Sequence, residues 1–368
     1  MKSIRYIFAL FSFCFLVGQT SFGQTDQKIA TPFEFQFEEK TLRGLIEKPK
    51  DKKSTAIIIL IPGYGKTNFV EGQWFSRLRD QLVATGLTVC FWDKMGCGNS
   101  DGVFNAQQPV ENSAEEAIAA IRAIQTLNLP ASNKIGLWGI SRAGWICPLI
   151  NAQFPIDFWI SVSGTDDQEN FGYLLAENLK IAGKQETEVE VLAQAWKEGH
   201  QLFCTQANFE TYLKAIKPLS QDSTSRKLFG YKNETKITDA AREAYTLNQK
   251  TYTSKGHFDE ESGLWVYLKD FDKILLEIKC PVLALFGAND SQVDWQKTKK
   301  LYEQTIGLDA NSILTTKVFP QCNHSLQKCI TCAYQEDLSA SNWDACNGYY
   351  ATMKAWLKDQ GIIEASDK

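Results

Sequence analysis

Short runs of apolar, mostly β-branched or aromatic residues recur along the chain, and between them apolar residues return every three or four positions. This alternation predicts strands and helices that form βα units around a mostly parallel sheet. Several runs are apolar at every position, which is typical of strands covered by helices on both faces. We therefore expect an α/β fold, with an opening antiparallel pair and further strands, at residues 33–37, 42–46, 56–61, 87–92, 134–138, 158–162, 281–286 and 313–319.

The segment before residue 134 carries a helix-start signal. Ser113 and Glu116 have the spacing of a capping box, in which the two side chains bond backbone N–H groups at the beginning of a helix. Ala117, Ile121 and Ile124 then recur at helical spacing. This helix is expected to lay one face on the sheet.

The strand pattern stops between Gly164 and Pro281. Residues 189–203 place apolar side chains on one helical face, and helical patterns continue beyond them, at 209–216 and 238–248. We expect no strand in this stretch. The predicted organisation is one α/β core at 24–164 and 276–368, interrupted by a mainly helical cap at 165–275.

The N-terminus has the pattern of a signal peptide, predicted at residues 1–23. Lys2 and Arg5 precede an apolar run, and small residues follow it at Ser21 and Gly23. A lipoprotein signal needs small residues just before its cysteine, and Cys14 has none there. We therefore expect an exported protein, periplasmic or secreted.

Composition and charge narrow the function classes. With 44% hydrophobic and 22% charged residues, the chain is globular rather than disordered or fibrous. A formal charge of −4 argues against a nucleic-acid partner, which would call for a basic excess. No later apolar run approaches the roughly 18 residues of a membrane span, so no membrane anchor is expected. The sequence carries no indication of oligomeric state.

Candidate chemistry begins at Gly139-Ile140-Ser141-Arg142-Ala143, directly after a predicted strand and before a helix-compatible segment. A strand-to-helix turn this sharp needs small residues two positions before and after its central residue. Gly139 and Ala143 meet this need, with alanine in place of the second glycine of G-x-S-x-G. The pattern predicts a nucleophile elbow with Ser141 as the nucleophile; a Gly-Ser turn without function is the alternative.

A serine nucleophile needs a general base and an acid that orients the base, and in this context the acid precedes the histidine in the chain. Of three histidines, His324 follows the last predicted strand, whereas His200 lies on the apolar face of the cap helix and His257 in a polar cap segment. Asp290 follows the preceding strand. Its rival, Asp294, lies further along, where the next helix is expected.

The turn Pro62-Gly63-Tyr64-Gly65 follows the strand at 56–61. Backbone N–H groups in such a position can stabilise a developing oxyanion, and the expected donors are those of Tyr64 and Arg142. The Tyr64 ring is expected to line the acyl pocket. A plain glycine-rich turn is the alternative.

Taken together, these motifs resemble those of the α/β-hydrolase superfamily, over nearly all of the chain after the leader. The loop from Asp93 to Gly102 resembles the D-x-x-G-x-G-x-S loop that these enzymes carry after their fourth strand, where its role is mostly structural. The layout is most similar to bacterial capped esterases and serine-aminopeptidase-like hydrolases. The resemblance implies hydrolysis of a small-molecule carboxylic ester by Ser141, Asp290 and His324, without a metal or organic cofactor.

The chain departs from this family at three places. Alanine stands at position 143, Pro62-Gly63-Tyr64 replaces a histidine-glycine oxyanion signature, and a cysteine-rich insertion follows His324.

A peptidase acting on peptide N-termini is the closest alternative. It would need a carboxylate for the substrate amine, and Asp166, Asp167 or Glu169 could supply one. We prefer to interpret these residues as a solvated helix start, where acidic residues are favoured by the helix dipole. The aromatic stretch 264–268 predicts an apolar pocket over the site, and ordinary core packing explains it equally well.

Nine cysteines follow Cys14, and four of them cluster at Cys322, Cys329, Cys332 and Cys346. In an exported chain this density predicts two disulfides, which would brace the loop carrying His324. Their connectivity stays open, although pairing Cys329 with Cys332 would close a very short ring. The alternatives are a zinc site and a thiol oxidoreductase using the C-x-x-C pair, Cys329 and Cys332. A redox motif is expected at a helix start early in a βαβ unit, not in the last loop.

Overall fold

The structure analysed is a computed structural model that describes residues 28–72, 74–106, 108–130, 133–231, 237–253, 257–260, 263–308, 313–336 and 344–364. The predicted signal peptide lies outside the described residues. Within the described ranges, no helix combines the length and the apolar character that a membrane crossing requires.

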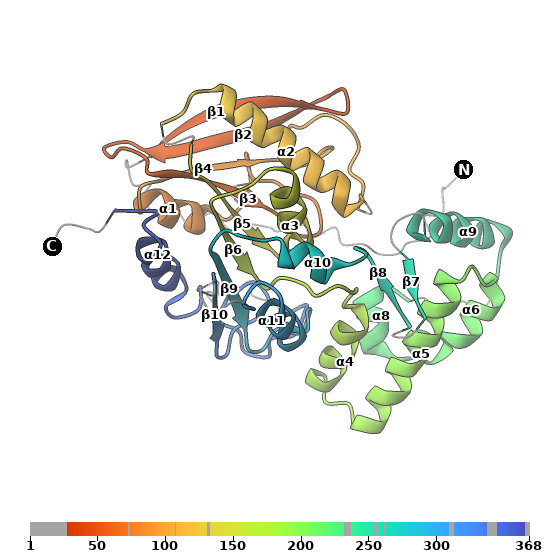
Figure 1. Ribbon diagram of the computed structural model, residues 1–368. Helices are drawn as coiled ribbons and strands as arrows, with labels where there is room; N and C mark the ends of the chain where they lie inside the picture. The colour runs from red at the N-terminus through yellow and green to blue at the C-terminus, as the bar shows by residue number, and fades with distance from the viewer. Residues whose placement is uncertain are drawn as a thin grey trace.

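One eight-stranded sheet forms the centre of the molecule, with the strand order β1-β2-β4-β3-β5-β6-β9-β10 (Figure 1). The strands are β1 (Lys28–Phe37), β2 (Lys40–Pro49), β3 (Ala56–Ile61), β4 (Leu87–Trp92), β5 (Ile135–Ile140), β6 (Phe158–Val162), β9 (Val282–Gly287) and β10 (Leu314–Phe319). β1 pairs antiparallel with β2 and β2 with β4, and the remaining neighbours are parallel. The expected α/β fold and its opening antiparallel pair are confirmed, and each predicted strand overlaps an observed one.

Helices cover both faces of this sheet, as the fully apolar strands require. In β3, Ile57, Ile59 and Ile61 pack into the cluster on one face, while Ile58 and Leu60 pack into the cluster on the other. The helices on the two faces are α2 (Val110–Thr126), α3 (Ala143–Gln153), α10 (Phe271–Leu276) and α11 (Trp295–Gln304) on the first, and α1 (Ser76–Ala84) and α12 (Tyr349–Asp359) on the second.

The predicted capping box is wrong. α2 begins three residues earlier than Ser113, after Pro109, and Ser113 Oγ instead bonds the Pro109 carbonyl at 3.1 Å. The proline side chain has no atom that can accept a hydrogen bond, so α2 begins without a side-chain cap. Glu116 is buried and accepts a hydrogen bond of 2.8 Å from Trp92 Nε1, a tertiary contact that no local pattern shows.

A mainly helical segment separates β6 from α10 and lies at one end of the molecule (Figure 1). Its helices are α4 (Phe171–Ile181), α5 (Glu186–Cys204), α6 (Phe209–Ala215), α7 (Lys217–Gln221), α8 (Ser223–Phe229) and α9 (Asp239–Thr253). It also contains a short antiparallel pair, β7 (His257–Asp259) and β8 (Leu264–Val266), where no strand was expected. Three residues per strand are too few for an alternating pattern to be recognised.

Candidate active site

Ser141 stands on a strained turn between β5 and α3. Its backbone φ is +59°, a left-handed conformation that is uncommon outside glycine and is held here by the surrounding structure. The Ser141 N–H donates to the Val162 carbonyl of the neighbouring strand at 3.0 Å, and the Ser141 carbonyl accepts from the Gly144 N–H at 2.7 Å. The turn is therefore anchored to the sheet on one side and to the helix start on the other.

The small residues around Ser141 are required by close contacts. A Cβ added to Gly139 would lie 2.9 Å from the Cβ of Ala143 and 2.7 Å from Cys147 Sγ, and one added to Gly144 would lie 2.6 Å from the Thr165 nitrogen. Ala143 is fully buried, and its Cβ faces Gly139, which has no side chain. Because only one of positions 139 and 143 must lack a Cβ, glycine at 139 allows alanine at 143.

Asp290 and His324 meet across the ends of β9 and β10. The Nδ1 atom of His324 and the Oδ2 atom of Asp290 are 2.8 Å apart, and both side chains are buried. Because a carboxylate only accepts, Nδ1 carries the proton and donates it, which leaves Nε2 as the accepting nitrogen. Oδ1 of Asp290 accepts backbone N–H groups of Gln292 and Val293, at 2.8 and 3.0 Å.

The rival acid and the other two histidines are placed elsewhere. Asp294 is the N-cap of α11 and accepts from the Lys297 N–H at 3.0 Å. His200 lies in α5, stacked on Trp196 with the ring centroids 4.9 Å apart, and burial lowers its pKa to about 4. His257 opens β7, and its side chain is outside the described part of the structure.

The turn after β3 packs directly on the elbow. A Cβ on Gly63 would lie 3.0 Å from the Ser141 Cβ and 3.6 Å from its Oγ. Among the described residues, neither the Tyr64 N–H nor the Arg142 N–H has a hydrogen-bond acceptor. The Tyr64 ring is half-exposed, and the Arg142 guanidinium lies 5.2 Å from its centroid. Two unused donors thus stand on the two segments that meet at Ser141.

The loop after β9, which carries Asp290 and is called the acid loop below, is held by α4. The sequence analysis did not predict this contact. The Tyr173 hydroxyl donates to the Asp290 carbonyl at 2.9 Å, and Asn178 Nδ2 donates to the Ser291 carbonyl at 3.0 Å. Asn178 Oδ1 accepts from the Tyr334 N–H at 2.7 Å, in the loop that follows His324. One buried asparagine therefore ties both loops to α4, and only its position in the folded chain reveals it.

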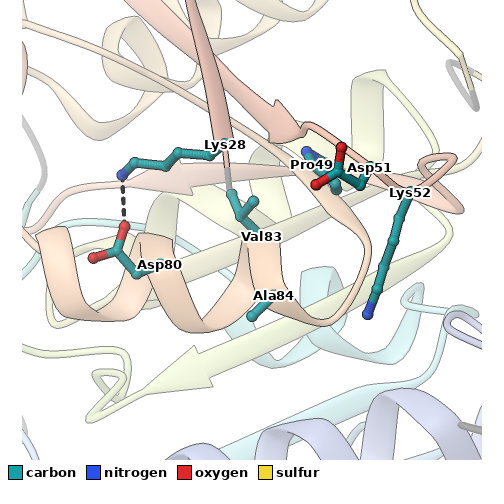
Figure 2. Close-up of a pocket in the computed structure, with 7 residues that line it drawn as sticks. All are labelled: Lys28, Pro49, Asp51, Lys52, Asp80, Val83 and Ala84. Carbon is teal, nitrogen blue, oxygen red and sulfur yellow. Dashed lines mark hydrogen bonds and ion pairs between the residues drawn. The ribbon is translucent and has the colours of Figure 1, made fainter. Parts of the chain in front are cut away.

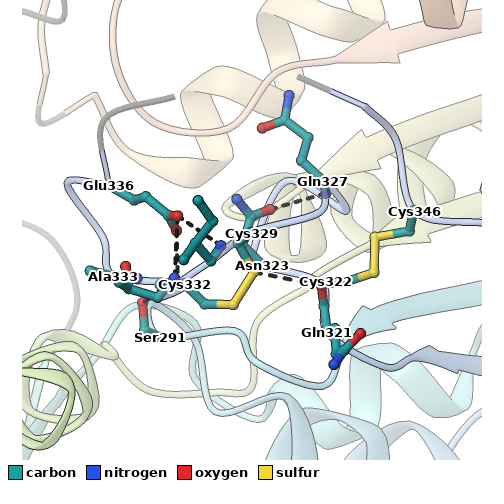
Figure 3. Close-up of a disulfide and its surroundings, with 12 residues drawn as sticks. Ser291, Gln321, Cys322, Asn323, Gln327, Cys329, Cys332, Ala333, Glu336 and Cys346 are labelled. Carbon is teal, nitrogen blue, oxygen red and sulfur yellow. Dashed lines mark hydrogen bonds between the residues drawn. A yellow bond between two sulfur atoms is a disulfide. The ribbon is translucent and has the colours of Figure 1, made fainter. Parts of the chain in front are cut away.

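Two disulfides lie in the loop after β10, as predicted: Cys322 pairs with Cys346, and Cys329 pairs with Cys332 (Figure 3). The pairing of Cys329 with Cys332, which the short ring made the less expected choice, is the observed one. The Glu336 carboxylate accepts the N–H groups of Ile330 and Cys332, each at 2.8 Å, and so stabilises this tight turn.

The disulfide loop contacts the acid loop through Ser291, whose Oγ donates to the Cys332 carbonyl at 2.7 Å (Figure 3). Since all four sulfurs are bonded in pairs, they offer no thiolates for zinc. The C-x-x-C pair lies in a loop, away from the helix N-terminus that would activate a thiol of an oxidoreductase.

The acidic residues after β6 are not a solvated helix start, because Asp166 and Glu169 are buried. Asp166 forms an ion pair of 2.7 Å with Lys297, while burial raises its pKa. Glu169 Oε2 accepts the Phe171 N–H at 2.7 Å, but Oε1 has no hydrogen-bond partner among the described residues. Burial raises the pKa of Glu169 to about 8. The Glu169 N–H donates to the Trp265 carbonyl of β8, which holds the loop inward.

Aromatic side chains connect Glu169 with the elbow region. Tyr252 and Tyr267 are half-buried, and the desolvation of their hydroxyls raises the pKa of both, with a smaller contribution from the nearby charge of Glu169. Tyr267 packs on Trp145 in the first turn of α3, with ring centroids 4.7 Å apart. The stretch 264–268 therefore combines core packing with a place beside the helix that follows Ser141.

A shallow groove elsewhere involves none of these residues. It lies between β1, the end of β2 and α1, where Lys28 and Asp80 form an ion pair of 2.6 Å (Figure 2). Its lining residues are Lys28, Pro49, Asp51, Lys52, Asp80, Val83 and Ala84.

The sheet topology and the loops at its carboxyl edge define a serine hydrolase of the α/β-hydrolase superfamily. The chain matches the sequence profile of the X-Pro dipeptidyl-peptidase (S15) family over residues 41–325, a range that contains Ser141, Asp290 and His324, and it belongs to this family. No curated protein matches it in sequence.

Solved structures of two kinds share the fold. An esterase of Pyrococcus furiosus has 14% identity and a TM-score of 0.51, over 90% of this chain and 91% of that one. A proline iminopeptidase of Mycobacterium smegmatis has 14% identity and a TM-score of 0.51, over 90% of this chain and 99% of that one. At such identities the likeness concerns the fold alone.

Proposed function

We propose that the protein hydrolyses carboxylic esters through an acyl-enzyme, with Ser141 as nucleophile, His324 as base and Asp290 as the acid that orients the base. The observation that carries this proposal is the 2.8 Å hydrogen bond between His324 and Asp290, at the same edge of the sheet as the Ser141 elbow. Ser141 follows β5, Asp290 follows β9 and His324 follows β10. Parallel strands bring their carboxyl ends together at one edge, where α/β proteins bind ligands.

In this mechanism, His324 Nε2 accepts the Ser141 proton while Oγ attacks the ester carbonyl. Asp290 keeps the imidazole in the required tautomer and stabilises its charged form. The N–H groups of Tyr64 and Arg142, which have no acceptor among the described residues, bind the oxyanion of the tetrahedral intermediate. His324 then returns the proton to the leaving alcohol, and a water activated by the same imidazole releases the acid.

The test is Ser141→Ala, assayed on aryl esters of increasing acyl length. Removing the nucleophile is expected to lower turnover by about 10⁴-fold while the circular dichroism spectrum is unchanged. A variant that keeps a tenth of the wild-type activity would exclude Ser141 as the nucleophile. A fluorophosphonate should label the wild-type protein once, and peptide mapping should place the label on Ser141.

Peptide hydrolysis is the second candidate, and Glu169 is the observation that favours it. A buried carboxylate with one unpaired oxygen is suited to receive a cation, such as the N-terminal ammonium of a peptide. The S15 family is named for X-Pro dipeptidyl-peptidase, and one structural neighbour is a proline iminopeptidase. In this version, the same serine chemistry acts on an amide bond near a free amine.

Glu169→Gln separates the two candidates, with Asp167→Asn as the matched control because Asp167 is exposed. If peptides are the substrates, Glu169→Gln raises KM for aminoacyl anilides at least tenfold and leaves aryl esters unaffected. If esters are the substrates, the wild-type protein hydrolyses aryl esters, and Glu169→Gln does not change the KM for aminoacyl anilides.

A further inference from the structure

Lys94 places its ammonium under the turn that follows β3. Nζ donates to the carbonyl oxygens of Gly63 and Gly65, at 2.6 and 3.0 Å. Lys94 itself belongs to the loop after β4 for which the sequence predicted a mostly structural role. No carboxylate of the described residues forms an ion pair with this ammonium, so its hydrogen bonds go to the backbone on both sides of Tyr64.

The bond to Gly63 bears on the direction of the Tyr64 N–H. The Gly63 carbonyl and the Tyr64 N–H belong to one planar peptide unit, and no described peptide bond is cis. In a trans peptide these two groups point in opposite directions, so holding the carbonyl at Lys94 turns the N–H away from it. Gly63 packs against Ser141, so this peptide unit lies next to the elbow.

Lys94 is itself fixed relative to this turn. Its backbone N–H donates to Thr67 Oγ1 at 2.9 Å, and Asp93 Oδ1 accepts the Phe69 N–H at 2.6 Å. Two hydrogen bonds between a backbone N–H and a side-chain oxygen thus join the two loops, in addition to the bond from the Lys94 side chain to Gly63. A side chain whose own backbone is fixed by hydrogen bonds can hold a peptide unit in one orientation.

Few charges surround the ammonium. Burial, followed by the repulsion of the Arg142 guanidinium, lowers the pKa of Lys94 to about 8, although Glu116 on α2 and the Cys97 thiol act in the opposite direction. Arg142 is bound in turn to Ser113 Oγ, at 3.1 Å, and to the Gln108 carbonyl. The Lys94 ammonium therefore lies against the turn that carries Tyr64, and the Arg142 guanidinium lies 5.2 Å from the centroid of the Tyr64 ring.

We propose that Lys94 is a positioning residue for the oxyanion site, which holds the Gly63–Tyr64 peptide unit so that its N–H faces the reacting carbonyl. The proposal rests on the proposed serine hydrolase mechanism. Lys94 does not touch the substrate; it acts through the peptide unit and through its charge. Its contribution arises in the transition state, where the oxyanion forms.

The experiment compares Lys94→Met with Lys66→Met, which removes an exposed lysine of the same turn. Lys94→Met should lower kcat on an aryl ester by about 10- to 100-fold, somewhat less than the loss of an oxyanion donor itself. KM should stay within about threefold, and Lys66→Met should behave as wild type. Affinity for a trifluoromethyl ketone, which forms a tetrahedral oxyanion adduct, should fall by the same factor as kcat/KM. Unchanged ketone affinity in a folded Lys94→Met protein overturns the proposal.

A pH profile keeps the proposal testable if Lys94→Met does not fold. Above about pH 8 the wild-type kcat should fall several-fold, because a neutral amine forms weaker hydrogen bonds than an ammonium. Lys94→Arg keeps the charge at all these pH values and should move this decline to higher pH. A decline at the same pH in Lys94→Arg contradicts the proposal.

Failure of the proposed function has a different signature. If wild-type Ser141 is not labelled by a fluorophosphonate, the hydrolase mechanism itself is wrong. If Ser141 is labelled and Lys94→Met matches wild type in kcat and ketone affinity, only the role of Lys94 is wrong.

Discussion

At the scale of single residues, the proposed mechanism depends most on the hydrogen-bonded pair Asp290 and His324. Both carboxylate oxygens of Asp290 have partners, the imidazole on one side and two backbone N–H groups on the other. In the proposed mechanism, these contacts hold Asp290 in place to stabilise the imidazolium that forms during the reaction.

His324→Ala is predicted to lower ester turnover by about 10⁴-fold, because no other group in the proposed mechanism can accept the Ser141 proton. His200→Ala is the control: it should lose stability, since the ring packs on Trp196, yet keep most of its turnover when folded. An inactive His200→Ala together with an active His324→Ala would reverse the assignment of the base.

Glu169 predicts a pH dependence of stability. Its pKa is about 8 in the folded protein, above the ordinary value of 4.5, so the folded state binds more protons than the unfolded state between these values. The free energy of unfolding should therefore fall as pH rises from about 4.5 to 8. Glu169→Gln, neutral throughout, should lack this fall, so that its advantage over wild type grows between pH 5 and pH 9. Urea unfolding at several pH values measures it, and parallel curves would contradict the prediction.

At the scale of elements, the site depends on loops that are tied together from outside the sheet. Asn178 on α4 bonds the acid loop and the loop after His324, and Ser291 bonds the Cys332 carbonyl. The Asn289 N–H also donates to the Cys322 carbonyl at 3.0 Å, two residues before His324. The segments that position the acid and the base thus share contacts with both disulfides.

The two disulfides are predicted to contribute unequally to the free energy of unfolding. The bond between Cys322 and Cys346 spans 24 residues, and loop entropy assigns it about 3 kcal/mol of stabilisation, against about 2 for the bond spanning three residues between Cys329 and Cys332. Cys322→Ala with Cys346→Ala should therefore lower the free energy of unfolding more than the matched pair Cys329→Ala with Cys332→Ala.

Mild reduction of the wild-type protein should lower kcat before the near-ultraviolet circular dichroism signal is lost, because the His324 loop loosens first. Simultaneous loss of kcat and signal would show that the disulfides act on the whole fold only.

At the scale of the whole molecule, the apolar core encloses the remaining thiols. The unpaired cysteines among the described residues are all buried, at Cys90, Cys97, Cys147, Cys204 and Cys280. Burial raises the pKa of the Cys90 and Cys280 thiols, which disfavours the reactive thiolate. Reaction of these thiols therefore reports on unfolding, and the two disulfides are compatible with the predicted export.

Thiol counting tests this picture. The native, processed protein should not react with a thiol reagent, the unfolded protein should release five thiols, and the unfolded and reduced protein should release nine. Retention of the leader adds Cys14 and raises the last two values to six and ten. Nine thiols without reduction would contradict the disulfides, and N-terminal sequencing would place the processing site near residue 23.

The amino-acid sequence alone determined the features that depend on local pattern. Strands buried on both faces are apolar at nearly every position, so β3, β4 and β6 were predicted with the bounds that the structure has. The elbow needs small residues at fixed spacing, and the order of acid and histidine follows the order of the strands, so Ser141, Asp290 and His324 could be selected as candidates from the sequence.

Tertiary structure decided the contacts between residues distant in sequence. Glu169 was interpreted as solvated and is buried, because β8 bonds its backbone from almost a hundred residues away. Glu116 is bound by Trp92 instead of capping a helix, and Lys94 reaches a turn thirty residues earlier. Burial and hydrogen-bond partners set the energy of a charged group, and both are properties of the folded chain. The sequence therefore indicated which groups can carry the chemistry, and the fold decided how each of them is held.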